Sequence, residues 1–453
     1  MTHHRVRRFQ AGSNHELLKQ EAQALLARLQ LIRPFALQEN MVPAAAIKPL
    51  TLRTIDRFLI RGRHRLFTSI NHYLDWLQSQ RGQESSPDVA NRRYAALRLH
   101  FNQVVSELDI FSDVITQRGE TDTGVMLSGL DLLAADALQI NGQLLEQPGM
   151  ICYLDRGHGA AIRRALTYLP TGGLSPVAVI KIPRERMVGS GVASSLIHEV
   201  GHQGISLFGL ADSVRSELES LPSKVNDPVW SYWSRCLNEI LADLWAVAKV
   251  GLTASVGLIG VVTLPRQLVF HLNPEGPHPM PWLRVRLSIA FGRALFADPQ
   301  WDRIENEWLS FYPVDDLSDQ LRELLDRFSQ SIPALIRLVI NHRPSSLGGV
   351  SLGRALMRAE MMPSNLTTRF QEWQRNSSLM LRASPCEVFA VIGQARYHGM
   401  ISPQNESQTL SRMLKHWAVS EILGSYLPGG RLPAEIASAT ASPALYAVRR
   451  NIV

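Results

Sequence analysis

The chain has 453 residues, of which 45% are hydrophobic and 19% are charged. This balance predicts a globular protein with sizeable cores, in two to three domains of roughly 150 residues each, and it excludes disorder over most of the length. The formal net charge is +7, but the arginines are scattered and no nucleic-acid-binding motif is present. We therefore expect a basic but ordinary surface and no nucleic-acid partner.

The cysteine content bears on the compartment. Cys152, Cys236 and Cys386 are odd in number and far apart in the sequence. This pattern predicts free thiols in a reducing compartment and not a disulfide framework. The charged N-terminus is not followed by an apolar segment, so a secretory signal is not expected. Together these features predict a cytoplasmic protein.

The first third of the chain is predicted to be helical. Apolar residues recur at intervals of three and four, which indicates amphipathic helices over residues 15–31, 52–77, 89–114 and 125–139. Prolines and polar patches separate these segments. The basic cluster at residues 61–65 is expected to be a solvent-exposed helix face.

The pattern changes near residue 149. Residues 150–154 form a short apolar run that is typical of a strand, and residues 177–182 form a second one between two prolines. Residues 155–159 are expected to turn into a helix that begins near residue 160. We therefore predict a small sheet in the middle of the chain.

Directly after the second strand comes the pattern H-E-x-x-H, formed by His198, Glu199 and His202. On a helix, positions i and i+4 share one face, so both imidazoles can face a single metal ion. Glu199 lies about 100° around the helix from His198 and can reach a water on that ion without being a ligand. The alternative is a helix whose polar residues have this spacing by chance.

A catalytic zinc ion usually takes three protein ligands and leaves a fourth position to water. Phe208 stands where a metzincin would have its third histidine. Glu239 and Asp243 are better candidates, because they are again i and i+4 on a helix expected over residues 230–250. One of them could bind the metal while the other hydrogen-bonds a ligand histidine. A solvent-exposed acidic face is the alternative, but the neighbouring residues are apolar.

An H-E-x-x-H helix followed by a helix with N-E-x-x-x-D resembles the gluzincins, the thermolysin-like zinc metallopeptidases. The resemblance implies that His198, His202 and Glu239 are zinc ligands. It further implies that Glu199 is the general base and that Asp243 orients His198.

The resemblance also implies two structural features. The separation from His202 to Glu239 is 239 − 202 = 37 residues, longer than in compact gluzincins, which implies an inserted loop near residues 210–227. The strand just before the H-E-x-x-H helix would be an edge strand that pairs with an extended peptide substrate. An ordinary core strand is the alternative.

Residues 244–264 contain a single charge, at Lys249, and are long enough to cross a bilayer. However, they continue directly from Glu239 and contain several glycines, and Pro265 follows them. We expect a buried helix pair behind the site and not a membrane span.

Farther on, His278 precedes a proline, and Arg284 follows within the same segment. This segment resembles the one that several gluzincin families place over the metal. The resemblance implies that His278 and Arg284 stabilise the oxyanion that forms when water attacks a carbonyl. His271 is a weaker candidate for this role, and a purely structural histidine in a proline-flanked turn is the alternative.

The remaining sequence predicts helices over residues 315–331, 385–397 and 404–423, without further chemistry. The tail, residues 427–453, is rich in alanine, proline and serine and is expected to be partly disordered.

The combined prediction is an α+β, predominantly α-helical protein. A zincin-like metallopeptidase core with a small sheet (residues 146–300) would lie between an N-terminal helical region (1–145) and a C-terminal helical region (301–453). The predicted function is Zn²⁺-dependent hydrolysis of a peptide or protein substrate. The alternative is a non-catalytic zinc-containing binding or regulatory protein whose helical regions bind a partner.

Overall fold

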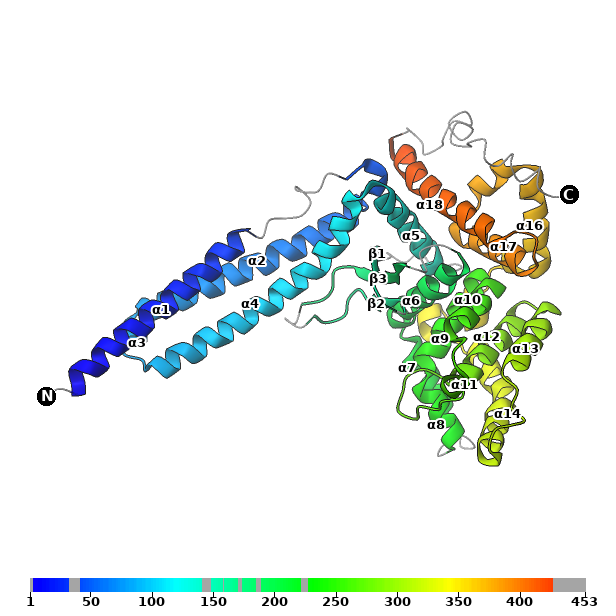
Figure 1. Ribbon diagram of the computed structural model, residues 1–453, viewed down its shortest axis with the longest axis horizontal. Helices are drawn as coiled ribbons and strands as arrows, with labels where there is room; N and C mark the ends of the chain where they lie inside the picture. The colour runs from blue at the N-terminus through cyan, green and yellow to red at the C-terminus, as the bar shows by residue number, and fades with distance from the viewer. Residues whose placement is uncertain are drawn as a thin grey trace.

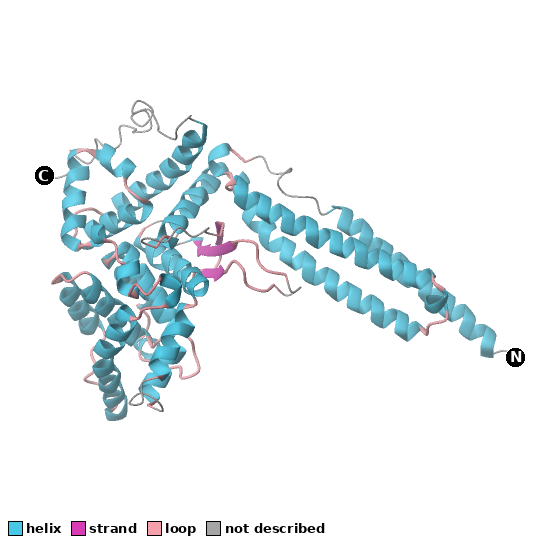
Figure 2. Cartoon of the chain, turned by 180° about the vertical axis from the view of Figure 1, so that it is seen from behind, coloured by secondary structure: helices cyan, strands magenta, loops and turns pink. Residues whose placement is uncertain are grey.

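The computed structural model describes residues 3–31, 41–140, 148–157, 159–169, 173–184, 189–220 and 227–426. These residues form a predominantly helical protein with one three-stranded sheet (Figures 1 and 2). The predicted α+β class, mainly helical with a small sheet, is confirmed in this coarse form. The tail predicted to be disordered, residues 427–453, lies outside the described residues.

A long arm of three long helices and one short one projects from the body of the molecule (Figure 1). The three long helices were predicted and extend beyond the predicted ranges, whereas the short α3 was not predicted; α2 and α4 begin at prolines. Ser86 accepts a hydrogen bond from the backbone N–H of Val89 and so caps the last arm helix. The arm consists of α1 (His3–Leu31), α2 (Pro49–Gln78), the one-turn α3 (Gln80–Gln83) and α4 (Pro87–Thr116).

The sheet lies between the arm and the body, in the strand order β1-β3-β2. β1 (Met150–Asp155) and β3 (Ala178–Pro183) are the two predicted strands, and they pair in parallel. The helix predicted to begin near residue 160 is wrong: β2 (Ala161–Arg163) pairs antiparallel with β3 instead. β2 forms because it pairs with β3, and residues 164–177 separate the two strands. The local sequence of β2 therefore does not reveal it.

The prediction that the strand before the H-E-x-x-H helix is an edge strand is also wrong. β3 is central, because β1 and β2 pair with its two sides. The outer edge of β1 is closed by side chains: Asp131 accepts from the N–H of Cys152 at 2.7 Å, and Gln117 accepts from the N–H of Leu154 at 2.8 Å. In the part of the chain that the structure describes, no strand pairs with the outer edge of β2.

The body is built on two helices that pack closely, α6 (Ser190–Phe208) and α9 (Leu237–Val250). Gly201 and Gly204 lie on the face of α6 that meets α9. A Cβ atom built on Gly204 would lie 2.2 Å from the Trp245 ring, and one on Gly201 would lie 3.0 Å from the Cα atom of Ala242. Two missing side chains therefore allow the backbones of α6 and α9 to approach each other.

Two predictions between these helices need correction. The inserted segment is not simply a loop: α7 (Leu210–Glu219) follows α6 after Gly209, whose φ of 60° reverses the chain, while residues 221–226 lie outside the described residues. The single helix expected over residues 230–250 is two helices, α8 (Pro228–Arg235) and α9, which meet at Cys236. No proline or glycine marks that break, so the apolar pattern conceals it.

The buried helix pair predicted over residues 244–264 is confirmed. The end of α9 and all of α10 (Leu252–Val262) form it, with a reversal at Gly251, whose φ is 55°. Among the described helices, none combines the length and the apolar character that crossing a membrane requires. All three cysteines are buried and unpaired, as predicted.

The rest of the body is helical and wraps around α6, α9 and α10 (Figure 1). One hydrophobic core runs from α5 to the last helix, across the boundary predicted near residue 300, and a second core lies in the arm and beneath the sheet. Further α-helices are α5 (Thr121–Leu138), α11 (Arg266–Val269), α12 (Pro281–Leu295), α13 (Gln300–Phe311), α14 (Asp319–Asn341), α15 (Leu352–Leu356), α16 (Pro363–Arg375), α17 (Pro385–Tyr397) and α18 (Pro403–Tyr426). Short 3-10 turns are η2 (Pro43–Ala45), η3 (Gln117–Gly119), η5 (Ser345–Leu347), η6 (Ala359–Met361) and η7 (Ser377–Arg382).

The close packing of α6 and α9 yields a prediction. Gly204→Ala should lower the free energy of unfolding by about 1–3 kcal/mol, because the added methyl group overlaps a rigid buried ring. Gly260→Ala is the matched control: it changes a helical glycine with no atom within 4 Å of its Cβ position and should stabilise by about 0.5–1 kcal/mol. Urea denaturation of both variants measures the difference. Equal effects would show that the α6–α9 contact tolerates a side chain here.

Candidate metal centre

Helix α6 holds the H-E-x-x-H residues in the middle of its length, and side-chain hydrogen bonds fix its start. At its start, Glu406 of α18 accepts hydrogen bonds from the backbone N–H and the hydroxyl of Ser190, at 3.0 and 2.6 Å. A carboxylate at this end also interacts favourably with the helix dipole. Leu196, Ile197 and Val200 are fully buried, so the helix cannot rotate without exposing them. The motif residues are therefore held in one orientation.

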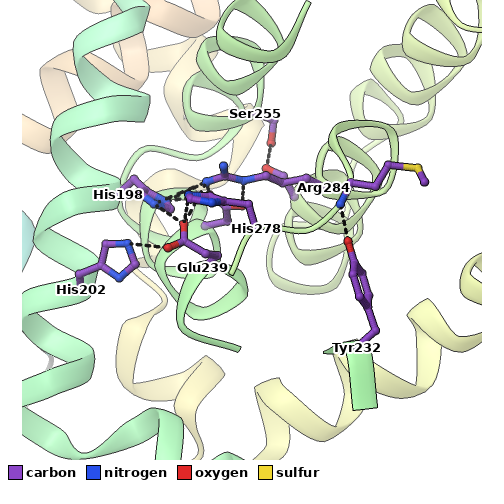
Figure 3. A network of polar contacts seen from close by, with 10 residues as sticks. His198, His202, Tyr232, Glu239, Ser255, His278 and Arg284 are labelled. Carbon is purple, nitrogen blue, oxygen red and sulfur yellow. Dashed lines mark hydrogen bonds and ion pairs between the residues drawn. The ribbon is translucent and has the colours of Figure 1, made fainter. Parts of the chain in front are cut away.

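Helix α9 brings the third candidate ligand to the two histidines (Figure 3). The Glu239 carboxylate lies 3.2 Å from His198 Nε2 through Oε2, and 3.4 Å from His202 Nε2 through Oε1. One donor atom from each of these three residues can be chosen so that all lie within 4.8 Å of one another. The structure thus brings together the three residues that the sequence singled out as ligands.

Asp243 lies one turn farther along α9, and its carboxylate is 2.8 Å from His198 Nδ1. This is the contact predicted for Asp243. The hydrogen bond fixes the orientation of the imidazole and directs Nε2 toward Glu239. Asp243 therefore positions a ligand without belonging to the ligand group.

The charges of the group depend on these contacts. Burial alone would lower the pKa of His198, but the carboxylates of Asp243 and Glu239 outweigh it and raise this pKa to about 9. Burial and the nearby charge of His198 lower the pKa of His202 to about 4. Burial opposes ionisation of Glu239, yet hydrogen bonds with His198 and His278 hold the pKa of its carboxyl well below the usual range. A proton on His198 thus offsets part of the negative charge of the two carboxylates.

Glu199 is half-buried and lies beside the group without being part of it. Burial raises the pKa of its carboxyl, and the charges of His198, Glu239, Arg284 and His278 all act on it. A carboxylate with a raised pKa is a stronger base. Its position and its pKa both suit the predicted role of proton acceptor.

His278 reaches the group from the loop before α12 (Pro281–Leu295). Its Nε2 lies 3.2 Å from Glu239 Oε2, and its side chain is 57% exposed. The loop is anchored by Tyr232, whose hydroxyl accepts a hydrogen bond from the N–H of Met280 at 2.7 Å (Figure 3). Tyr232 escaped sequence analysis, since nothing in the sequence of α8 relates it to this loop.

Arg284 lies in the first turn of α12, and its guanidinium contacts the carboxylates of Asp243 and Glu239. Its Nε and Nη2 donate to the two oxygens of Asp243 at 2.7 and 2.9 Å, and Nη2 lies 3.7 Å from Glu239 Oε2. The sequence placed Arg284 correctly at the site, but its closest partner is the carboxylate that orients His198. The side chain of His271 forms no hydrogen bond or ion pair with these described residues.

Two further residues border the group and were missed. Gln203, the neighbour of His202, accepts a hydrogen bond from the N–H of Ala165 through Oε1 at 2.8 Å. This bond ties the segment after β2 to α6. The charge of Arg164, the residue before Ala165, also contributes to the low pKa of His202. A glutamine and an arginine carry no motif, so only the fold reveals them.

The donor set suits a zinc ion. Two imidazole nitrogens and one carboxylate form a ligand set known from catalytic zinc sites. Tetrahedral bonds of about 2.0–2.1 Å would place neighbouring donors roughly 3.4 Å apart. The carboxylate of Glu239 lies 3.2 Å from His198 through Oε2 and 3.4 Å from His202 through Oε1, and the three donors lie within 4.8 Å of one another, so small side-chain movements would bring them to that spacing. His278 is not among the three residues of this group in the described structure.

Comparisons with protein-family models, with curated proteins and with solved structures find no match for this chain. The resemblance to gluzincins consequently stays a prediction that rests on the motif residues and on the geometry described above.

The buried ion pair between Arg284 and Asp243 yields a second prediction. Arg284→Met should lower the free energy of unfolding by about 3–5 kcal/mol, because it removes the guanidinium that donates to both oxygens of the buried Asp243 carboxylate and leaves His198 as its remaining partner. Arg215→Met removes an arginine from an exposed pair with Asp212 and should cost under about 1 kcal/mol. Chemical denaturation of the two variants without added metal makes the comparison. Losses of similar size would mean that Asp243 does not depend on Arg284.

Proposed function

We propose that this protein is a zinc-dependent metallopeptidase. The observation that supports the proposal best is the convergence of His198, His202 and Glu239 from two helices, with Glu199 beside the group and Asp243 behind it. A solvated helix face would not bury Glu239 and Asp243 to 8% and 6% exposure. Polar residues that share this sequence spacing by chance would not be expected to bring the donor atoms of His198, His202 and Glu239 close together.

The chain's own residues divide the work. His198, His202 and Glu239 would hold the ion, while Asp243 and Arg284 keep His198 in place. When bound, zinc would lower the pKa of a coordinated water and polarise the substrate carbonyl. Glu199 takes the proton of the attacking water and passes it to the leaving amine, a role worth roughly a hundred- to ten-thousand-fold in rate.

His278 suits the remaining task. Its imidazole is exposed at the rim of the group, where a carbonyl oxygen would gain negative charge during attack. A hydrogen-bond donor at that place stabilises the transition state more than the substrate. Arg284 acts through Asp243 in this proposal and does not touch the substrate.

No described strand pairs with the outer edge of β2, and this edge offers a place for an extended peptide. Ala165, two residues after β2 ends, donates a hydrogen bond to Gln203, the neighbour of His202. An extended chain added to β2 would form backbone hydrogen bonds whatever its sequence, and would run close to the ligand helix. The substrate class we propose is therefore a peptide or an extended protein segment.

Paired variants test the proposal. Glu199→Gln should keep bound zinc but lose nearly all peptide hydrolysis, because the proton acceptor is gone while the ligands remain. Glu239→Ala should lose the zinc itself, whereas Glu219→Ala, on the surface of α7, should change neither property. Elemental analysis and a peptide-library assay provide the two readouts. Unchanged zinc content and hydrolysis in the first two variants would refute the assignment.

A second candidate function rests on the 3.2 Å contact between His278 and Glu239. If His278 supplied a fourth ligand, the site would be closed, as structural zinc sites are, and the protein would be a non-catalytic binding or regulatory protein.

His278→Ala separates the two functions. In the peptidase, zinc affinity should stay within about twofold while kcat falls by roughly a hundredfold, the cost typical of a lost oxyanion donor. In the closed site, zinc affinity itself should fall strongly. Competition with a zinc chelator measures the affinity, and a large loss there would favour the non-catalytic protein.

A further inference from the structure

Beyond β2 the chain continues as a hairpin, whose described parts are residues 164–169 and 173–177. Tyr168 opposes Leu174 five positions beyond the pair Arg163 and Val179 on each strand, so the hairpin extends the β2–β3 ladder in the same register. Backbone hydrogen bonds join Leu166 N–H to the Ser175 carbonyl at 2.9 Å. Figure 2 shows this hairpin as loops that leave the strands and extend toward the arm.

One side of the hairpin is buried. Leu169 and Val177 are 3% and 1% exposed and belong to the core of the arm. Ala165 is anchored to α6 by its bond to Gln203. The hairpin is therefore held at its root and along one side, and it is not a free loop.

The other side presents three large apolar residues to solvent. Leu166, Tyr168 and Leu174 are 60%, 79% and 45% exposed. Cross-strand partners project to the same face, so Tyr168 and Leu174 lie side by side. Polar residues are expected on an exposed face of an antiparallel sheet, and exposed apolar clusters commonly mark interaction sites. We call these three residues the hairpin face.

Leu166 adds a further sign of function. With a φ of 60°, it is the one non-glycine residue with positive φ in the described part of the chain. Such a conformation costs a leucine free energy and tends to persist where function requires it.

The hairpin face continues the edge of β2 that no described strand pairs with. Ala165, at the root of the hairpin, donates a hydrogen bond to Gln203, the neighbour of His202, at 2.8 Å, and Tyr168 follows three residues later. An extended strand covers about 3.3 Å per residue, so Tyr168 lies at most ~10 Å along the chain from that point. A peptide added to β2 and running outward would pass beside the hairpin face about three residues from the cleaved bond.

We propose that the hairpin face is a substrate-binding exosite for an extended protein segment with large apolar side chains about three residues from the cleaved bond. This inference rests on the proposed peptidase function. It names the class of substrate: segments long enough to reach past the metal centre and apolar at their far end. Short peptides would occupy β2 alone and lose this contact.

The test uses three peptides that share one core, which is taken from library cleavage or, if no peptide is cleaved, is a polyalanine segment: the core alone, the core extended by six residues with leucine and phenylalanine at the far end, and the same extension with serines there. The parent should cleave the apolar extension with a kcat/KM about tenfold above that of the serine extension, mainly through KM, because the contact is uniform binding. The double variant Tyr168→Ser, Leu174→Ser should lose this preference but cleave the core peptide normally. Leu268→Ser, which changes a residue 52% exposed on α11, should keep it.

A binding experiment separates this inference from the proposed function. With Glu199→Gln as background, fluorescence anisotropy should show about tenfold weaker binding of the apolar extension when Tyr168 and Leu174 are serine. If no variant or parent hydrolyses any peptide but this difference in binding appears, the peptidase proposal fails and the hairpin face stands. An unchanged preference for apolar extensions in the double variant would overturn the inference. So would sedimentation showing that the double substitution converts a dimer to a monomer without changing peptide binding, since the face would then bind a second copy.

Discussion

The contact between α6 and α9 is the constraint on which the rest of the structure depends. The two histidines lie on one helix, and the third residue of the candidate metal centre, Glu239, comes from another helix, 37 residues from His202 (239 − 202 = 37). Gly201 and Gly204 remove the side chains that would hold the helices apart, and Ala242 and Trp245 fill the space. Since Glu239 and Asp243 lie on the same helix as Trp245, this packing sets the position of the acids as well.

Bringing these groups together has an electrostatic cost that the surrounding charges offset. Two carboxylates, Glu239 and Asp243, are buried near each other, and burial alone favours their neutral forms. Arg284 neutralises Asp243 from behind, and the proton that raises the pKa of His198 compensates Glu239. A divalent cation that replaced the proton of His198 would change the net charge of these side chains by one unit. The buried carboxylates would therefore have a positive partner both with and without the ion.

The local sequence contained most of the site but little of its surroundings. His198, Glu199 and His202 follow from helical spacing alone, and Glu239 and Asp243 from the same spacing on a second helix, and the structure unites all five. The helix break at Cys236 and the strand β2 could not be predicted, because the first lacks a proline or glycine and the second depends on pairing with β3. Tyr232, Gln203 and Arg164 were missed for a similar reason: their role comes from the fold and not from a motif.

In the proposed centre, two imidazoles and a carboxylate hold one ion and leave a position for water. X-ray absorption spectroscopy at the zinc edge of the zinc-loaded chain measures this coordination directly. We predict two imidazole ligands and two oxygen ligands at about 2.0–2.2 Å, without sulfur. Three imidazoles, a sulfur ligand from Cys236, or the absence of an ordered shell around the metal would contradict it.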